Sequence, residues 1–320
     1  MKVCTVYLDQ NVLTELRVSE IREIGSNFAS LLEVLKRPDF QVIYSEYTLI
    51  EISKVKSEEF VVEHLNVLNM LNAIYWNNQF PHKSPDSKIV YKDYFESKNS
   101  SLSQRLDYKN KKLIQSLNGI DTGATAQKRF DSLIDELVST PFSLLSKKLP
   151  ILKRPIDKIG EKVSQYASKK LNPLNEIEGY SVLNLIPDLR EIINDSSYES
   201  IESYSPKEVF KEVERRLFNH DPNLPVLLSH NVAGIENKIE FLFLLLNWVA
   251  YFPDRFQNTT NKKGLHNASM LDAKHASLAW HFDFIISTDE KFRKKALACY
   301  YFRGSKAQVL SVEEFLKVFI

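Results

Sequence analysis

Cysteine and glycine are scarce in this chain of 320 residues. Only Cys4 and Cys299 are present, and neither belongs to a CxxC pair. This argues against a disulfide framework and favours a reducing cytoplasm. Glycine occurs only 8 times, as expected for a helix-rich chain with few tight turns. The scarcity of both residues therefore points away from a small disulfide-stapled fold.

Long apolar runs and targeting segments are missing as well. The longest apolar stretch, Phe241 to Phe252, is too short to span a bilayer and is interrupted by Asn247. The first residues lack the basic and apolar regions of a signal peptide. We therefore expect a cytoplasmic protein without a membrane partner, in which residues 241–252 form a buried core helix.

An excess of charge of one sign is absent overall but present locally. The formal net charge of +1 gives no global indication of a nucleic-acid or acidic partner. Residues 147–170, however, hold eight basic and two acidic side chains, whereas residues 173–203 hold seven acidic and one basic. The basic segment could form a groove for a polyanion, and the acidic segment could occupy that groove as a mimic of the polyanion. Two solvated helix faces that pair with each other are the favoured interpretation.

Several catalytic motifs are also absent. The chain has no GxxxxGK[ST] loop, no HExxH or Cys/His zinc spacing and no GxSxG elbow. A phosphatase with an aspartyl nucleophile would need a second acid two residues after Asp9, and Asn11 occupies that position. These absences argue against nucleotide binding by a P-loop, zinc chemistry and serine hydrolysis.

Strand-like and helix-like segments alternate at both ends of the chain. The spacing of apolar residues predicts strands at 3–8, 41–44, 284–287 and 308–310. It predicts helices at 19–36, 45–76, 269–281 and 290–298, and a last helix that Ser311 and Glu314 open with a capping box. This alternation is typical of an α/β fold. Residues 76–228 show no such alternation and are expected to be mostly helical or loop.

Four acids lie either just after a predicted strand or near the start of a predicted helix. Asp9 follows the first strand, Glu51 lies in the second turn of the helix after the second strand, Asp272 is expected in the first turn of a helix opening near Ser269, and Asp289 follows the strand at 284–287. All four are therefore expected at the carboxyl edge of the sheet, where open α/β sheets bind ligands.

Carboxylates that converge in one cleft repel each other, and a divalent cation removes that penalty. Oxygen ligands suit Mg²⁺ or Mn²⁺, which can activate water and neutralise charge on a phosphodiester. Each acid also has a structural explanation. Asp9 could begin an Asx turn, Asp272 and Asp289 could cap helices, and Glu51 could pair with Lys54.

The two ends of the chain carry four motifs: LDQNVL, SEYTLIEI, LDAKHASLAWHFDFIISTDEKF and QVLSVEEFL. Together they resemble the PIN-domain family of metal-dependent nucleases. The resemblance implies a three-layer α/β fold around a central, mostly parallel sheet, with Asp9, Glu51, Asp272 and Asp289 as the acidic quartet that holds the metal and serves catalysis. Asn11 and Ser287 are expected to support the site as polar groups. Asp283 is an extra carboxylate near the site, for which a loop or strand-entry position is favoured. His275 could contact substrate, although helix packing is favoured for it.

The resemblance covers only the two ends, so a discontinuous domain is expected. Residues 1–75 and 230–320 would form the PIN-like nuclease domain, and residues 76–229 a mainly helical insertion that could cover, extend or regulate the active edge. Within the insertion, Lys147, Lys148, Lys153 and Arg154 are candidates for tracking the backbone of a nucleic acid.

The expected function is that of a metal-dependent nuclease, an endoribonuclease acting on single-stranded RNA. The family resemblance alone favours RNA and a role as a toxin or in defence. An uncontrolled nuclease would be harmful, so an inhibitor or regulatory protein is expected as a partner. The alternatives are a DNase and a non-catalytic helical interaction scaffold built on a PIN-like core.

Overall fold

The computed structural model describes residues 3–17, 26–77, 80–82, 86–98, 190–220, 235–253 and 262–320. Six strands form one sheet in the spatial order β4-β3-β2-β1-β5-β6, with five parallel strands and β4 antiparallel to β3 at one edge. The two ends of the chain meet in the middle of this sheet, because β1 pairs with both β2 and β5. The expected α/β class and mostly parallel sheet are confirmed. The strands are β1 (Cys4–Leu8), β2 (Phe40–Ser45), β3 (Ile74–Asn77), β4 (Phe80–His82), β5 (Phe284–Ile286) and β6 (Gln308–Leu310).

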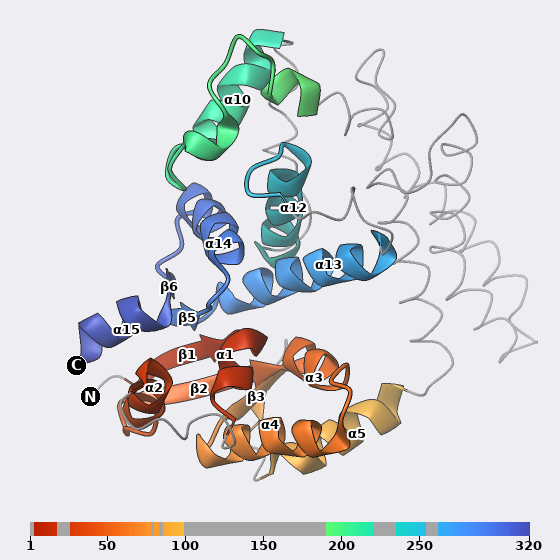
Figure 1. The fold of residues 1–320 in the computed structure, drawn as a ribbon, viewed down its shortest axis with the longest axis vertical. Coiled ribbons are helices and arrows are strands. Elements are labelled where there is room, and N and C mark those ends of the chain that lie inside the picture. The colour runs from red at the N-terminus through yellow and green to blue at the C-terminus, as the bar shows by residue number, and fades with distance from the viewer. Residues whose placement is uncertain are drawn as a thin grey trace, which may run out of the picture.

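Helices cover both faces of the sheet. Figure 1 shows α12, α13 and α14 on one side of the strands and α4 and α5 on the other. The helices of the first part are α1 (Gln10–Glu15), α2 (Asn27–Leu35), α3 (Glu46–Ile52), α4 (Glu58–Met70) and α5 (Ser87–Lys98). Those of the second part are α10 (Val209–His220), α12 (Ile235–Trp248), α13 (Lys262–Ala279), α14 (Glu290–Arg303) and α15 (Val312–Phe319), with the short 3-10 helix η3 (Ile201–Ser203) before them.

Alternate residues of β1 enter two different cores, as the two-residue repeat of a strand requires. Val6 and Leu8 pack with apolar side chains of α2, α4 and α15. Tyr7 packs on the opposite face with side chains of α12, α13 and α14. The result is a three-layer arrangement with the sheet in the centre. The run of buried side chains in α12 confirms the buried core helix expected at residues 241–252, although the helix ends at Trp248.

The expected single helical region at 45–76 was wrong. The chain forms α3, turns, forms α4 and then enters β3, which pairs with β2. The reversal between α4 and β3 passes through Asn72, which has a φ of 48°. Asparagine tolerates this left-handed conformation better than most residues. The strand β3 (Ile74–Asn77) also crosses the boundary expected between the nuclease domain, ending at residue 75, and the insertion, beginning at residue 76. The sheet therefore extends into the first residues of the expected insertion.

Another helix begins earlier than expected. The Ser269 side chain suggested a cap, but α13 begins at Lys262. Ser269 is buried within the helix, and its Oγ accepts a hydrogen bond from Asn247 Nδ2 of α12 at 2.7 Å. The serine therefore joins two helices instead of opening one. In contrast, the capping box of Ser311 and Glu314 at the start of α15 is confirmed.

Of the expected insertion, the described residues after α5 are mainly 190–220. Here α10 packs against α14, and its Glu212 accepts hydrogen bonds from two guanidinium groups, Arg215 and Arg216. Arg216 is buried and also donates to the carbonyls of Ile193 and Glu199. Through these hydrogen bonds Arg216 joins α10 to residues 193 and 199 of the same segment. The division into a nuclease domain and a helical insertion stays a prediction.

Candidate functional site

Asp9 lies directly after β1 in the middle of the sheet, as expected. The strand ends at Leu8 and α1 begins at Gln10, so Asp9 is the N-cap of this helix. Its carboxylate is only 9% exposed. Oδ1 accepts from the Gln10 backbone N–H at 2.8 Å, and Oδ2 accepts from the Ser287 hydroxyl at 2.6 Å. The Asp9 carboxylate is therefore held both by the first backbone N–H of α1 and by Ser287, which follows β5.

The charge on Asp9 is incompletely compensated. Burial raises the pKa of Asp9, and the nearby Glu51 carboxylate adds to the rise. The hydrogen bond from Ser287 and the imidazole of His275 oppose this rise without cancelling it. The site therefore contains a carboxylate that would gain from a nearby cation.

Glu51 lies in the second turn of α3, as expected, and faces another helix. Ser45 at the end of β2 caps α3, which aims the helix's N-terminal half toward the carboxyl edge of the sheet. Glu51 Oε2 is 3.1 Å from His275 Nε2 of α13. The two atoms are close enough for an ion pair but are not aligned as a hydrogen bond.

His275 is the centre of a buried polar network. It is 2% exposed, and the Tyr7 hydroxyl lies 2.6 Å from its Nδ1. The same hydroxyl is 2.9 Å from Ser45 Oγ and 3.2 Å from Thr48 Oγ1. Burial by itself lowers the pKa of His275, but Tyr7 and then Glu51 and Asp9 outweigh it, so the pKa lies well above its usual value. The imidazole of His275 therefore lies between the Tyr7 hydroxyl and the Glu51 carboxylate.

Sequence reasoning missed Tyr7, Ser45 and Thr48 as parts of the site. A hydroxyl in the middle of an otherwise apolar strand was the available signal for Tyr7, because a buried phenol needs a hydrogen-bond partner. For Ser45 the signal was its place at the end of β2 before a helix. His275 was expected mainly as a packing residue. It does pack against Tyr7 and Tyr47, and it also bridges toward the acids.

The other two acids of the quartet contribute less directly. Asp272 was expected in the first turn of a helix, but it lies well inside α13, half-buried and one turn before His275. Positions three apart share a helix face, so Asp272 remains on the side of α13 that carries His275. Asp289 follows β5 as expected and caps α14, where Oδ1 accepts from the backbone N–H groups of Lys291 and Phe292. Its structural explanation is therefore confirmed.

The supporting residues divide between the two edges of the sheet. Ser287 is fully buried, donates to Asp9 and accepts from the Asp289 backbone N–H. Asn11 is exposed on α1. Asp283 directly precedes β5, so the strand-entry position favoured for it is confirmed, and it lies at the opposite edge from Asp9, because the register pairs Phe284 with Val6. Its Oδ2 accepts from both the backbone N–H and the hydroxyl of Thr5, so it ties β5 to β1.

Buried side-chain atoms without a hydrogen bond gather around Asp9. Four such atoms occur among the described residues, and three of them are Gln10 Oε1, Glu51 Oε2 and His275 Nε2. Glu51 Oε2 and His275 Nε2 face each other at 3.1 Å, so Gln10 Oε1 is the one of these three atoms that a ligand or bound ion would still have to satisfy. In the described ranges no three His, Cys, Asp or Glu side chains come close enough together to form a metal site by themselves.

Comparisons with protein-family models, with curated proteins and with solved structures found no match for this chain.

The four basic candidates at positions 147, 148, 153 and 154 lie outside the described residues. Across the part of the chain that the structure covers, no helix combines the length and the apolar character needed to cross a membrane. The features of the chain that indicate a function are thus the carboxyl edge of the sheet and the sequence motifs.

Proposed function

We propose that this chain is a PIN-like, metal-dependent nuclease that hydrolyses phosphodiester bonds in the cytoplasm. One observation carries the proposal. Asp9 is buried at the carboxyl end of the central strand, is oriented by Ser287, and shares its electrostatic surroundings with Glu51 and His275. Ligands of open α/β sheets bind at this edge, and perturbed carboxylates concentrate at functional sites.

The residues at this edge fit Mg²⁺ or Mn²⁺. Asp9 and Glu51 supply hard oxygen donors, and the Glu51 carboxylate lies beside His275, with Oε2 3.1 Å from its Nε2. Mg²⁺ in proteins keeps several waters and is bound through one or two carboxylates together with substrate phosphates. The absence of three converging ligands in the described residues is compatible with this mode. When bound, such an ion would neutralise charge on the phosphodiester and lower the pKa of adjacent water.

The chain's own residues hold this arrangement in place. Ser287 fixes one oxygen of Asp9 and the α1 backbone fixes the other. His275 packs its ring against Tyr7 and Tyr47 and places Nε2 3.1 Å from Glu51 Oε2, and the Tyr7 hydroxyl holds the ring at Nδ1. Asp289 keeps the start of α14 next to Ser287 through its own backbone N–H. Asp9 and Glu51 are thereby prepared to orient an attacking water in line with the leaving oxygen.

Single-stranded RNA is the substrate that the family resemblance favours, with cleavage inside the strand. The same resemblance supports a role as a toxin or in defence against foreign genetic elements, controlled by an inhibitor or regulatory protein. A DNase would use the same edge, because carboxylates that hold a metal ion do not distinguish the sugar of the substrate.

The test is cleavage of labelled single-stranded RNA and DNA with Mn²⁺, with Mg²⁺ or with chelator. Wild type should cut RNA only with metal, and Asp9→Asn should lower the rate at least about 100-fold, since a metal's charge stabilisation is worth several kcal/mol. Asp93→Asn, which changes an exposed carboxylate of α5, is the matched control and should cut normally. Equal cutting by all three proteins, or none by any, would favour the interaction scaffold instead.

A further inference from the structure

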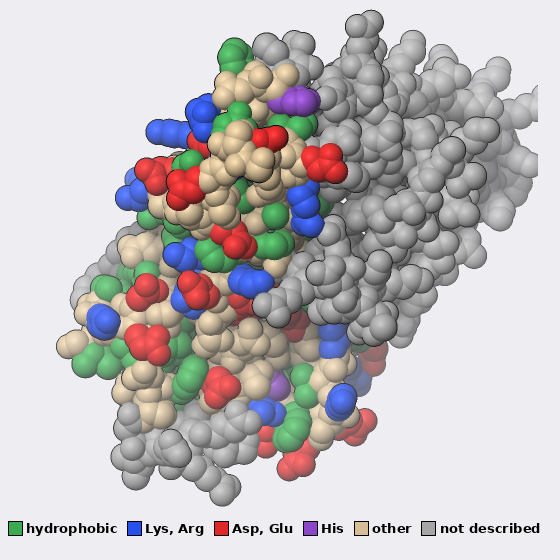
Figure 2. Space-filling view, turned by 45° about the horizontal axis from the view of Figure 1, so that its top comes forward, with side chains coloured by type: hydrophobic (Ala, Val, Ile, Leu, Met, Phe, Trp, Pro, Cys, Tyr) green, Lys and Arg blue, Asp and Glu red, His purple; other side chains and the backbone are tan. Residues whose placement is uncertain are grey.

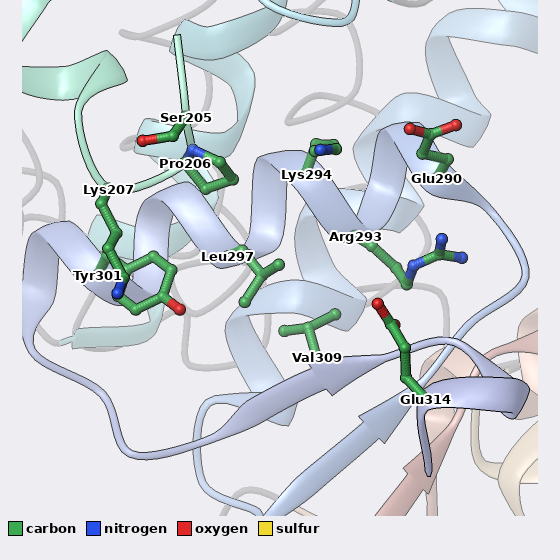
Figure 3. A pocket seen from close by; sticks show the side chains of 10 residues that line it. All are labelled: Ser205, Pro206, Lys207, Glu290, Arg293, Lys294, Leu297, Tyr301, Val309 and Glu314. Carbon is green, nitrogen blue, oxygen red and sulfur yellow. The ribbon is translucent and has the colours of Figure 1, made fainter. Parts of the chain in front are cut away.

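A pocket of about 400 Å³ lies on the side of α14 that faces away from the core. Figure 3 shows it between α14, the turn 205–207 that precedes α10, and the end of β6 with the start of α15. Its α14 wall consists of Glu290, Arg293, Lys294, Leu297 and Tyr301. Residues at this three- and four-residue spacing share one helix face, so the wall is a continuous stripe roughly 16 Å long.

The lining combines cations with an apolar floor. Arg293 and Lys294 lie on α14, and Lys207 enters from the opposite wall. Leu297 and Val309 form the apolar part, as seen in Figure 3. Tyr301 is 48% exposed, and the Lys207 ammonium lies 5.1 Å from its ring centre. Positive side chains beside an exposed aromatic ring form the usual surface for a nucleotide, whose phosphate needs charge and whose base needs a flat contact.

Two carboxylates also line the pocket. Glu290 lies at the first turn of α14 and Glu314 at the start of α15, where Figure 3 shows it near Arg293. The surface in Figure 2 likewise mixes basic and acidic side chains. A strand would therefore be held at particular points and not by a uniformly basic face. Carboxylates in such a place accept hydrogen bonds from the amino groups of bases.

The pocket is physically joined to the candidate active edge. Arg293 Nη1 donates to the backbone carbonyl of Ser287 at 2.9 Å, and the Ser287 hydroxyl donates to Asp9 at 2.6 Å. Arg293, at the cationic end of the pocket, is thus linked to the buried Asp9 carboxylate through a single residue, Ser287. A polynucleotide with one phosphate at Asp9 could place a neighbouring nucleotide along α14.

From these contacts we infer that the pocket binds a nucleotide of the substrate strand next to the cleaved bond. Its phosphate would face Arg293 and Lys294, and its base would lie against Leu297, Val309 and Tyr301. The turn 205–207 would then give the expected insertion a part in substrate binding, through Lys207. This inference rests on the proposed nuclease function and adds where the strand lies.

The experiment measures binding of fluorescein-labelled single-stranded RNA and DNA of one sequence to full-length Asp9→Asn protein at several salt concentrations. Adding Tyr301→Ala should weaken binding by about 5- to 100-fold, the range for loss of one base contact. Adding Lys294→Ala should weaken it and reduce the salt slope by about 0.7, as for one lost phosphate contact. Lys317→Ala removes an exposed cation of α15 outside the pocket and should change neither value.

The outcomes separate this inference from the nuclease function. If the pocket variants bind like Lys317→Ala, while wild type still cuts and Asp9→Asn does not, the pocket inference is overturned and the function stands. If binding depends on Tyr301 and Lys294 but no protein cuts, the pocket stands and the nuclease function fails. Competition by a free nucleoside monophosphate as strong as by the oligonucleotide would overturn the placement of a strand.

Discussion

Two buried clusters of charge in this molecule differ in how completely their charges are compensated. In α10, Glu212 lies between two guanidinium groups, and the buried Arg216 also donates to two backbone carbonyls. The hydrogen bonds from Arg215 and Arg216 lower the pKa of Glu212 to about 2 despite partial burial. At the carboxyl edge, burial instead raises the pKa of Asp9, and nearby polar atoms lack hydrogen bonds.

The difference indicates what each cluster is for. A charged group whose partners are all inside the chain needs nothing further and contributes to a fixed geometry. A desolvated carboxylate with an incomplete set of partners is costly unless something else binds there. The α10 cluster thus fits a structural role and the Asp9 cluster fits the proposed metal site, so metal should affect stability only through the second.

Glu212→Gln should have the largest effect on stability. It leaves Arg216 buried without its counter-charge, so the free energy of unfolding should fall by about 3 kcal/mol. Urea unfolding measures this difference. Glu33→Gln, which breaks the exposed pair with Lys36, is the control and should change the value by less than about 0.5 kcal/mol. Equal losses in the two variants would remove the structural role assigned to the α10 cluster.

Metal should stabilise the protein through the other cluster. Mn²⁺ at about 100 times its dissociation constant should raise the free energy of unfolding by about 2.7 kcal/mol, because it binds the folded state. Asp9→Asn should lose this increment, whereas Glu212→Gln should keep it in full. Thermal unfolding across a Mn²⁺ series tests the contrast. An undiminished shift in Asp9→Asn would place the metal elsewhere.

The positions of Asp9, Glu51, Ser287 and Asp289 could be predicted from the sequence because each depends on local signals. A strand ends at a polar residue, and a capping side chain marks where the next helix begins. These signals also predicted four strands of the sheet. The strand β3 was missed because four residues after a long helical pattern give too little periodicity to be recognised.

The remaining errors come from partners far away in the chain. Ser269 has the residue type of a cap, but Asn247 uses its hydroxyl across α12 and α13. Tyr7 and His275 are 268 positions apart, so nothing local predicts their contact. Asp283 could be expected at the entry of β5, but its hydrogen bonds from Thr5, 278 positions away, could not. Local chemistry thus predicted which residues are polar at strand ends, and only the fold assigns their partners.

Tyr7→Phe tests whether the carboxyl edge depends on its polar network. The change removes the hydroxyl beside His275 Nδ1, Ser45 and Thr48 and leaves a buried imidazole nitrogen unpaired, at a cost of roughly 2 kcal/mol. Cleavage should fall as well, because the ring next to Glu51 loses its anchor. Tyr91→Phe on α5 is the matched control and should cost under about 0.5 kcal/mol. Unchanged stability and cleavage in Tyr7→Phe would contradict the network's role.

Acid should weaken the α10 cluster by a smaller amount. The pKa of Glu212 is about 2 in the folded chain against an ordinary 4.5, so the unfolded state binds more protons between these values. Its contribution is complete above pH 4.5 and disappears as the pH falls toward 2. Because Arg215 is half exposed and solvent screens the pair, we expect a loss of only roughly 1 kcal/mol. The stability difference between wild type and Glu212→Gln should therefore narrow in acid, and a constant difference down to pH 2 would show that folding does not lower the pKa of Glu212.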